Sequence, residues 1–343
     1  MTVVTERGDE KISSYAIIWA FEEFYFYLKV SAVILDGRYQ GLEPYELEYL
    51  KVTRCPLCDA AGGQRVPLPI AAYRFGRRAI RLPPGGVHLV ECDFCGLHYK
   101  DIVPSRSALG SLFAAGAQDV WTDKQIPFAL ERTHLACFLK EGDGSLIDIG
   151  SSDGALVRAV GDIASLTSAL DVYDDPRCRA AVSGEYVIGF IEDSALRVGR
   201  AYNVATAFDV FEHFYDPKSV AGNLQRLLAA HGVVFGETGN VEAVPLASAW
   251  WYVRLVEHHI FWNRKSLEYF CRQFGFTLEL ILPTAHKGRR YMPWAKRLAV
   301  LALHIGRNSP WLANLAWRAK QIDTRMIGNP FERDHFLFAL RKS

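Results

Sequence analysis

The sequence predicts an α/β protein in which a small cysteine-rich module precedes a larger domain built on a mostly parallel sheet. From Ser145 onward, short apolar runs alternate with stretches of helical periodicity, a pattern typical of βαβ units. A glycine-rich turn at 150–154 follows the first run, and two Cys-x-x-Cys pairs lie within residues 51–104, here called the cysteine module. The length of 343 residues fits two domains or one large α/β unit with additions.

Seven apolar runs are predicted strands. They cover residues 145–149, 164–171, 185–190, 203–211, 232–237, 276–282 and 334–341. A helix is expected from about Pro217 to Ala230, and another over 266–274 ends at Gly275, a residue type favoured just after a helix. Because helical stretches separate most of these runs, we expect one seven-stranded, mostly parallel sheet.

A basic helical hairpin is predicted as an insertion before the last strand, over residues 284–333. Pro293 and Pro310 open its two helices, and Gly306 ends the first. Residues 280–322 contain 8 basic residues and no acidic one, although the whole chain has a net charge of only +1. The hairpin therefore either packs on the acidic remainder of the chain or meets an anionic acceptor or a membrane surface as a peripheral contact.

The remaining parts of the chain are predicted to be helical connections. Residues 1–50 form a helical extension, and residues 105–143 link the cysteine module to the sheet domain at 144–343. The apolar stretch Tyr15–Leu35 is long enough to span a bilayer, but two glutamates near its middle favour a docked amphipathic helix. Cysteine usage and the lack of an apparent secretory signal predict a reduced, cytoplasmic protein.

Four cysteines have the spacing of a metal site: Cys55, Cys58, Cys92 and Cys95. Each Cys-x-x-Cys pair can supply one edge of a tetrahedron, and two pairs complete a Cys₄ set with no open position. We therefore predict a structural Zn²⁺ that folds the module and takes no part in catalysis. Paired disulfides, bound iron or a site without metal are the alternatives.

The turn after the first predicted strand has the features of a cofactor site. It runs from Asp148 through Gly150 and Ser152 to Gly154, so a ligand can approach the backbone closely and meet the free N–H groups of the next helix. Asp171 ends the second strand, where a carboxylate can accept hydrogen bonds from both ribose hydroxyls. Glu192 follows the third strand, within possible reach of an adenine amino group. On these residues alone, a tight turn without a ligand remains open.

Further polar residues follow the fourth strand, in the run from Asp209 through Glu212 and His213 to Asp216-Pro217. Ligands of open α/β sheets bind at the carboxyl ends of the strands, where this loop is expected. His258 and His259 occur together in a later run. Histidine suits proton transfer near neutral pH, so these residues are candidates for an acid–base role.

Taken in order, DIGSSDG, ALD, IED and FDVFEHFYDP resemble class I S-adenosylmethionine-dependent methyltransferases, over about residues 144–282 and again in the last strand. With CPLC…CDFCGLHY, the chain is similar to bacterial sugar and natural-product methyltransferases that carry an N-terminal zinc-binding region. The resemblance implies a Rossmann-like sheet and S-adenosyl-L-methionine as cofactor, and Gly-x-Gly-x-x-Gly is absent, which disfavours NAD. The cofactor contacts that we predict are Asp148, Gly150, Ser152, Gly154, Asp171, Glu192 and Asp209.

The same resemblance places a Glu-His pair and a later histidine segment at the active site. We predict Glu212, His213, His258 and His259 as catalytic, with one histidine as the base if the acceptor must lose a proton. The alternatives are a pocket-shaping role for the Glu-His pair and a hydrogen bond at a helix entry for His259. Nearby aromatic residues form either a wall for the acceptor or ordinary packing: Trp250, Trp251, Tyr252, Phe261 and Trp262.

The predicted function is methyl transfer to a small-molecule or saccharide acceptor, such as a sugar, a polysaccharide precursor or a secondary metabolite. The alternative is an RNA methyltransferase whose zinc-binding module grips RNA through the basic residues Arg65, Arg74, Arg77, Arg78 and Arg81. RNA is disfavoured because no basic and aromatic residues interleave in the manner of a stacking platform, and no DNA partner is expected. A scaffold that has lost cofactor binding is a third interpretation.

Overall fold

The computed structural model describes residues 46–68, 70, 72–75, 78–114, 128–194, 199–244, 247–284 and 334–343. Residues 1–45 of the predicted N-terminal extension 1–50 and residues 285–333 of the predicted hairpin 284–333 lie outside the described residues. Within the described ranges, no helix is both long enough and apolar enough to cross a membrane.

The central sheet has seven strands and confirms the predicted fold class. They are β8 (Ser145–Ile149), β9 (Leu166–Asp171), β10 (Tyr186–Ile188), β11 (Tyr202–Phe208), β12 (Leu228–Gly239), β14 (Phe276–Thr284) and β15 (His335–Lys342). Their spatial order is β10-β9-β8-β11-β12-β15-β14. The first five strands of that order pair in parallel, and β15 lies antiparallel between β12 and β14. The order in which the chain adds strands reverses between β8 and β11, where open α/β sheets bind their ligands.

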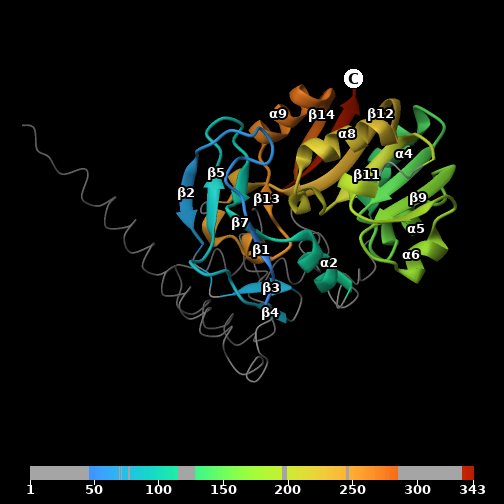
Figure 1. The fold of residues 1–343 in the computed structure, drawn as a ribbon. Helices are drawn as coiled ribbons and strands as arrows, with labels where there is room; N and C mark the ends of the chain where they lie inside the picture. Colours follow the sequence, from blue (N-terminus) through green and yellow to red (C-terminus); the bar gives the residue numbers. More distant parts are fainter. Residues whose placement is uncertain are drawn as a thin grey trace, which may run out of the picture.

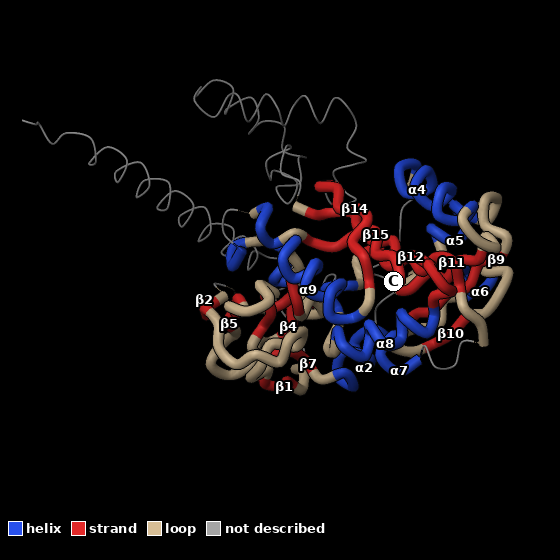
Figure 2. Tube along the Cα trace, turned by 90° about the horizontal axis from the view of Figure 1, so that it is seen from above, coloured by secondary structure: helices blue, strands red, loops and turns tan. Residues whose placement is uncertain are grey.

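Helices cover both faces of this sheet, as Figure 2 shows from above. On one face lie α4 (Ala129–Lys140), α5 (Ala155–Val160) and α6 (Pro176–Ala181). On the other lie α7 (Ile191–Ser194), α8 (Pro217–Leu227) and α9 (Arg264–Phe274). Each face has its own buried apolar cluster, which explains why the parallel strands read as continuous apolar runs rather than as alternating ones.

Capping residues set the ends of these helices. One predicted helix and one predicted strand end earlier in the structure than expected. Helix α8 begins at Pro217 after the N-cap Asp216, and α9 ends at Gly275 in the left-handed conformation. The predicted helix up to Ala230 ends earlier, because residues from Leu228 onward extend β12. The predicted strand 203–211 ends at Phe208, since Asp209 has a positive φ of 54° and turns the chain into the short 3₁₀ helix η2 (Phe211–His213).

The cysteine module is a group of short antiparallel strands beside the large sheet (Figure 1). Its strands are β1 (Tyr49–Lys51), β2 (Gln64–Pro67), β3 (Tyr73–Phe75), β4 (Arg78–Ile80), β5 (His88–Glu91), β6 (His98–Lys100) and β7 (Ile102–Pro104), followed by α2 (Arg106–Ala114). One four-stranded sheet has the order β13-β6-β5-β2, and β13 (Ile260–Phe261) comes from the sheet domain. The two parts of the chain are therefore joined by strand pairing as well as by side-chain packing.

Candidate active site

The turn after β8 is held tightly against the neighbouring loops. Gly150, Ser152 and Gly154 all have positive φ angles, of 70°, 51° and 77°. A Cβ atom on Gly150 would lie 2.5 Å from Val210 Cγ2, and one on Gly154 would lie 2.8 Å from Cys178 Cα. Glycine is required at both positions for its conformation and its lack of a side chain. Both glycines thus let the turn pack against Val210 and against Cys178 of α6. The predicted contact of this turn with a ligand stays a prediction.

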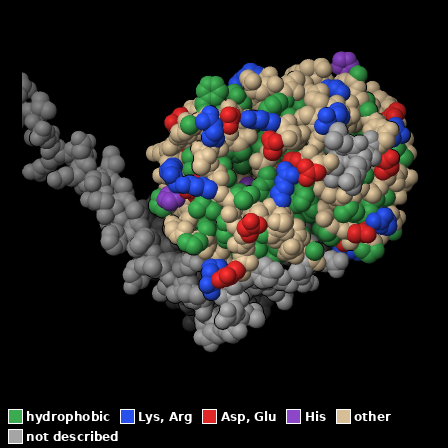
Figure 3. All heavy atoms as spheres, viewed as in Figure 1, with side chains coloured by type: hydrophobic (Ala, Val, Ile, Leu, Met, Phe, Trp, Pro, Cys, Tyr) green, Lys and Arg blue, Asp and Glu red, His purple; other side chains and the backbone are tan. Residues whose placement is uncertain are grey.

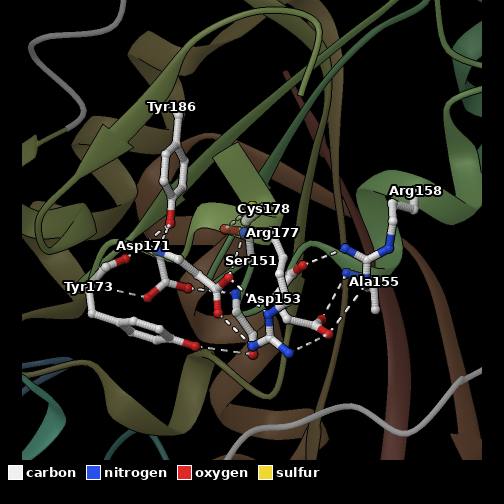
Figure 4. Close-up of polar contacts among 11 residues, drawn as sticks. Ser151, Asp153, Ala155, Arg158, Asp171, Tyr173, Arg177, Cys178 and Tyr186 are labelled. Carbon is white, nitrogen blue, oxygen red and sulfur yellow. Dashed lines mark hydrogen bonds and ion pairs between the residues drawn. The ribbon is translucent and has the colours of Figure 1, made fainter. Parts of the chain in front are cut away.

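Asp171, at the end of β9, is fastened to this turn. Its Oδ2 accepts a hydrogen bond from Ser152 N–H at 2.7 Å, and its Oδ1 accepts one from Tyr173 N–H at 3.3 Å (Figure 4). Burial raises the pKa of this carboxyl to about 6. A carboxylate offers about four acceptor positions, so these two bonds leave capacity for ligand hydroxyls. Its contact with a ribose stays a prediction.

A network of arginines and aspartates surrounds the turn, and sequence reasoning missed it. Arg158 donates to the backbone oxygen of Asp153 at 2.6 Å, and Arg177 donates to Asp175 at 2.6 Å (Figure 4). Arg177 also lies 3.7 Å from Asp153. These residues fix the shape of the turn from its outer side. No motif marks them, because their pairing follows only from the way in which α5 and α6 pack.

The other predicted cofactor residues have partners within the protein. Asp148 is buried and accepts a hydrogen bond from Thr206 Oγ1 at 2.7 Å. Asp209 donates its N–H to Glu237 O at 2.9 Å. Glu192 accepts from Tyr215 N–H at 3.1 Å and lies 3.4 Å from the Arg106 guanidinium. Glu192 therefore ties the loop after η2 to α2, and its predicted contact with adenine stays a prediction.

Glu212 lies at the centre of a second, fully buried polar group. Thr238 Oγ1 donates to its Oε2 at 2.7 Å, and Tyr252 OH donates to its Oε1. Burial, with a further contribution from Asp209, raises the pKa of the Glu212 carboxyl to about 7. The two hydroxyl donors favour the charged form against the effect of burial. Sequence reasoning found Glu212 but missed Thr238 and Tyr252, which no local pattern connects to it.

His213 is held in one tautomer by its neighbour. Its Nδ1 lies 2.9 Å from the backbone oxygen of Glu257. A carbonyl oxygen can only accept, so Nδ1 carries the proton in the neutral ring and Nε2 is left with a free lone pair. Nε2 lies 4.0 Å from Glu212 Oε1, and burial lowers the pKa of the ring below its usual value of 6.5. This is the arrangement of a base that is orientated through one nitrogen and accepts a proton on the other.

The structure brings His258 to this group and turns His259 away from it. His258 Nε2 lies 4.0 Å from Glu212 Oε1, and its ring stands edge-on to the His213 ring, with centroids 4.9 Å apart. The His259 ring instead packs on Tyr215, with centroids 4.1 Å apart. Among the described residues, His258 Nδ1 and both ring nitrogens of His259 have no hydrogen-bond partner. Burial lowers the pKa of both histidines well below 6.5.

Glu212, His213 and His258 could in principle also hold a metal, since their ligand atoms all lie within 4.8 Å of one another. Each oxygen of Glu212 accepts one hydrogen bond from a hydroxyl group and keeps a further lone pair. We assign no metal to the group, and its acid–base role stays a prediction.

The predicted aromatic wall divides between the site and the core. Trp262 is fully buried and donates its Nε1–H to Phe211 O at 2.9 Å, which supports a packing role. Trp250 stacks on Tyr252 at a centroid distance of 4.5 Å, and Phe261 packs beside them. The side chain of Trp251 lies outside the described residues. Figure 3 shows this face of the molecule hollowed near its centre, with apolar side chains around the hollow.

The four predicted zinc ligands converge in the structure. Cys55 Sγ lies 3.5 Å from Cys95 Sγ, Cys58 Sγ lies 3.5 Å from Cys92 Sγ, and all four sulfurs lie within 4.8 Å of one another. Zinc–sulfur bonds of about 2.3 Å in a tetrahedron separate the sulfurs by about 3.8 Å, so the cluster has the size of a zinc site. The two turns are alike, because Asp59 and Gly96, each directly after a second cysteine, have positive φ angles of 61° and 76°.

The order of the sheet and the turn after β8 define a class I methyltransferase fold, and comparison with known proteins agrees. Residues 123–281 match the family model described as a methyltransferase domain. The chain therefore carries a class I S-adenosylmethionine-dependent methyltransferase domain.

Two curated relatives are ubiquinone biosynthesis O-methyltransferases. The one from Vibrio atlanticus is 30% identical over 102 residues, which are 28% of this chain and 43% of that protein. The one from Salmonella paratyphi A is 30% identical over 115 residues, which are 30% of this chain and 48% of that protein. The chain thus spans less than half the length of these relatives. Among solved structures, Burkholderia thailandensis 1,6-didemethyltoxoflavin-N1-methyltransferase is 12% identical with a TM-score of 0.45, and the match covers 76% of this chain and 96% of that one.

Proposed function

We propose that the protein transfers a methyl group from S-adenosylmethionine to a hydroxyl group of a small-molecule or saccharide acceptor. The observation that carries this proposal is the orientation of His213, whose Nδ1 faces the Glu257 carbonyl at 2.9 Å and whose Nε2 is left to accept a proton. A hydroxyl acceptor needs such a base. The two relatives named as O-methyltransferases support oxygen as the atom methylated.

The residues around the turn after β8 fit the methyl donor, which supplies a methyl group activated on a sulfonium. Gly150 and Gly154 let the turn pack closely against Val210 and Cys178 with positive φ angles. Asp171 has acceptor capacity left for hydroxyl groups, and a buried carboxylate binds such groups strongly because no water competes with them. These residues would hold the donor in line with the acceptor oxygen, and alignment supplies most of the catalysis in a displacement of this kind.

On the acceptor side, the chain has to remove one proton. As the acceptor oxygen forms its bond to the methyl carbon, the carbon–sulfur bond breaks with its electron pair staying on sulfur, and the hydroxyl proton passes to His213 Nε2. Glu212, with an oxygen 4.0 Å from that nitrogen, stabilises the resulting imidazolium. The carbonyl of Glu257 keeps the ring in place throughout.

The cysteine cluster fits a structural zinc ion, which we propose as the second cofactor. Three of the four cysteines are buried, and all four sulfurs converge in the geometry of a closed site. A closed Cys₄ site has no position for a substrate, so the ion would stabilise the cysteine module and leave the chemistry to the histidines.

No observation favours the RNA alternative. Arg65 pairs with Asp101, and Arg81 pairs with Glu46 at 2.8 Å, so their charges are already balanced within the protein. The side chains of Arg74, Arg77 and Arg78 lie outside the described residues.

The test is incorporation of a tritiated methyl group from S-adenosylmethionine. Equal amounts of protein are given a saccharide and small-molecule extract or total RNA, with a His213→Ala variant as the matched control. We expect label in the extract fraction with the parent protein and at most background label with the variant. Label in RNA alone, or equal label with both proteins, would contradict the proposal.

A further inference from the structure

Residues 255–263, here called the histidine segment, lie between the cysteine module and the active-site helix η2. On the side of the module, Ile260 and Phe261 pair with β6, and Lys100 donates its N–H to His259 O at 2.9 Å. Asn263 Nδ2 donates to Gly96 O at 2.9 Å, directly after the second Cys-x-x-Cys pair. The cysteine module therefore forms one complete edge of the histidine segment.

The opposite edge of the same segment is bonded to η2. His259 donates its N–H to Glu212 O at 2.8 Å, and Glu257 O accepts from His213 Nδ1 at 2.9 Å. Two backbone hydrogen bonds thus lead from Lys100 to His259 and from His259 to Glu212. A shift of β6 would therefore be transmitted through these two hydrogen bonds to Glu212 and to His213, the next residue.

Lys100 is the one cationic residue of β6, and its side chain is fully buried behind the histidine segment. Its relative exposure is 0%, and its Nζ donates to Leu255 O at 2.7 Å. The ammonium also lies 4.3 Å from the centroid of the Tyr73 ring. Fully buried lysines are rare because burying the charge costs free energy, so the burial of Lys100 points to a specific role for its charge.

We propose that Lys100 is a positioning residue for methyl transfer: from the cysteine module it fixes the histidine segment through Leu255 and keeps His258 and His259 unprotonated by its positive charge. This proposal rests on the proposed function, because it assigns the lysine to the site where the acceptor loses its proton. It gives the cysteine module a direct part in the acceptor site.

The electrostatics of the site agree with the geometry. The positive charge of Lys100 contributes to the lowered pKa of both histidines, next to the larger effect of burial. Burial lowers the pKa of Lys100 itself to about 7, so the lysine is charged at the lower pH values at which the histidines would take up a proton. Because Lys100 is hydrogen-bonded to Leu255 O and His259 O, its charge lies beside the segment that carries both rings, and a neighbouring charge of the same sign disfavours their protonation.

Other titratable groups also face these residues, from every element packed against them. Glu212 and His213 lie on η2, Tyr252 and Glu257 lie before the histidine pair, and the remaining groups are Tyr73 on β3, Arg106 on α2, Tyr215 after η2 and His335 on β15. Glu257 is the carboxyl whose charge favours the protonated form of Lys100. A change at Lys100 alone is therefore a clean probe, because it leaves all these groups in place.

The test compares Lys100→Met with Lys100→Arg and Tyr73→Phe. Methionine has nearly the same length without the charge, arginine keeps the charge, and phenylalanine keeps the ring below the ammonium while removing a hydroxyl that has no partner among the described residues. The measurement is the titration of the ¹³C-labelled histidine rings by NMR, with His258→Gln and His259→Gln used for assignment. We expect Lys100→Met to raise the midpoint of at least one of the two rings by about one pH unit, as loss of a nearby charge does. Lys100→Arg and Tyr73→Phe should leave both midpoints low.

The pH dependence of turnover gives a second readout. If turnover needs His258 or His259 in the neutral form beside the base His213, the acidic limb of the kcat profile moves to higher pH in Lys100→Met and stays in place in the two control variants. Unchanged ring midpoints in a folded Lys100→Met protein would overturn the proposal, even if its activity fell. Because the NMR titration needs no acceptor, it decides the role of Lys100 separately from the proposed function, which fails if the parent protein labels no acceptor at all.

Discussion

The cofactor side and the acceptor side of this active site are assembled in different ways. Most of the cofactor side comes from one stretch, in which β8, the glycine-rich turn, α5 and β9 bring Gly150 and Asp171 together. The acceptor side comes from five segments: η2, the carboxyl end of β12, the 3₁₀ helix η5 (Trp251–Arg254), the histidine segment and β6 of the cysteine module. The cofactor side is therefore fixed by local structure, whereas the acceptor side depends on how the parts of the chain pack.

This difference suggests how the protein separates its two tasks. The glycine-rich turn can keep its conformation for binding one methyl donor. The acceptor side can meanwhile change through substitutions in other segments. The cysteine module is hydrogen-bonded to the histidine segment, so we expect its influence to fall mainly on acceptor turnover. The following predictions test that separation, beginning with the largest expected effect.

Replacing His213 by alanine should abolish most of the turnover. Loss of a general base costs about 10²- to 10⁴-fold in rate, and here the base is held in its tautomer by the Glu257 carbonyl. The measurement is kcat with a labelled acceptor. The control is His134→Gln in α4, on the other face of the sheet. A loss of less than about threefold in His213→Ala would remove this histidine from the mechanism.

Disrupting the cysteine cluster should affect the acceptor side alone. In Cys95→Ser we expect loss of bound zinc, measured by elemental analysis, and a fall in turnover of about 10²-fold, as small misplacements of catalytic groups can cause. Affinity for S-adenosylmethionine should stay within about twofold of the parent, since the turn at 150–154 is hydrogen-bonded to β9 through Leu170 and Asp171. Equal losses of both functions would show that the two sides are not separate.

Two buried threonines offer a matched comparison of the two sides. Thr206 donates to Asp148 on the cofactor side, and Thr238 donates to Glu212 on the acceptor side, each at 2.7 Å. Replacement of either by valine should lower the free energy of unfolding by about 1–3 kcal/mol, because a buried carboxylate loses a donor. Denaturant titration measures this loss. Only Thr238→Val should also lower kcat, and a similar fall in Thr206→Val would weaken the account.

The raised pKa of Asp171 predicts a pH dependence on the cofactor side. With a pKa of about 6 in the folded protein against 3.8 in the unfolded chain, the folded state binds the proton first. The contribution of this group to the free energy of unfolding is therefore largest below pH 3.8 and is lost as the pH rises through 6. Donor affinity should follow the opposite course, weakening as the pH falls below 6 and the carboxylate is protonated. An Asp171→Asn variant whose affinity depends on pH as in the parent would contradict this assignment.

The same contrast explains which features could be predicted from the sequence. The seven strands, the glycine-rich turn and the four cysteines follow from periodicity and short spacings, and the structure places them as expected. Thr238 and Tyr252, the partners of Glu212, lie 26 and 40 residues from it in the chain. Contacts over such distances leave no local pattern, and Lys100 acts across 155 residues to Leu255. The prediction of β11 was too long for a local reason, since a positive φ at the non-glycine Asp209 is not apparent from the sequence.

The most direct test of the account is calorimetric titration of S-adenosylmethionine into the parent protein, Asp171→Asn and His213→Ala under the same conditions. The account predicts one binding site in the parent, a dissociation constant raised at least about tenfold in Asp171→Asn, and a value within about twofold of the parent in His213→Ala. Absence of binding to the parent protein, or equal weakening in both variants, would contradict it.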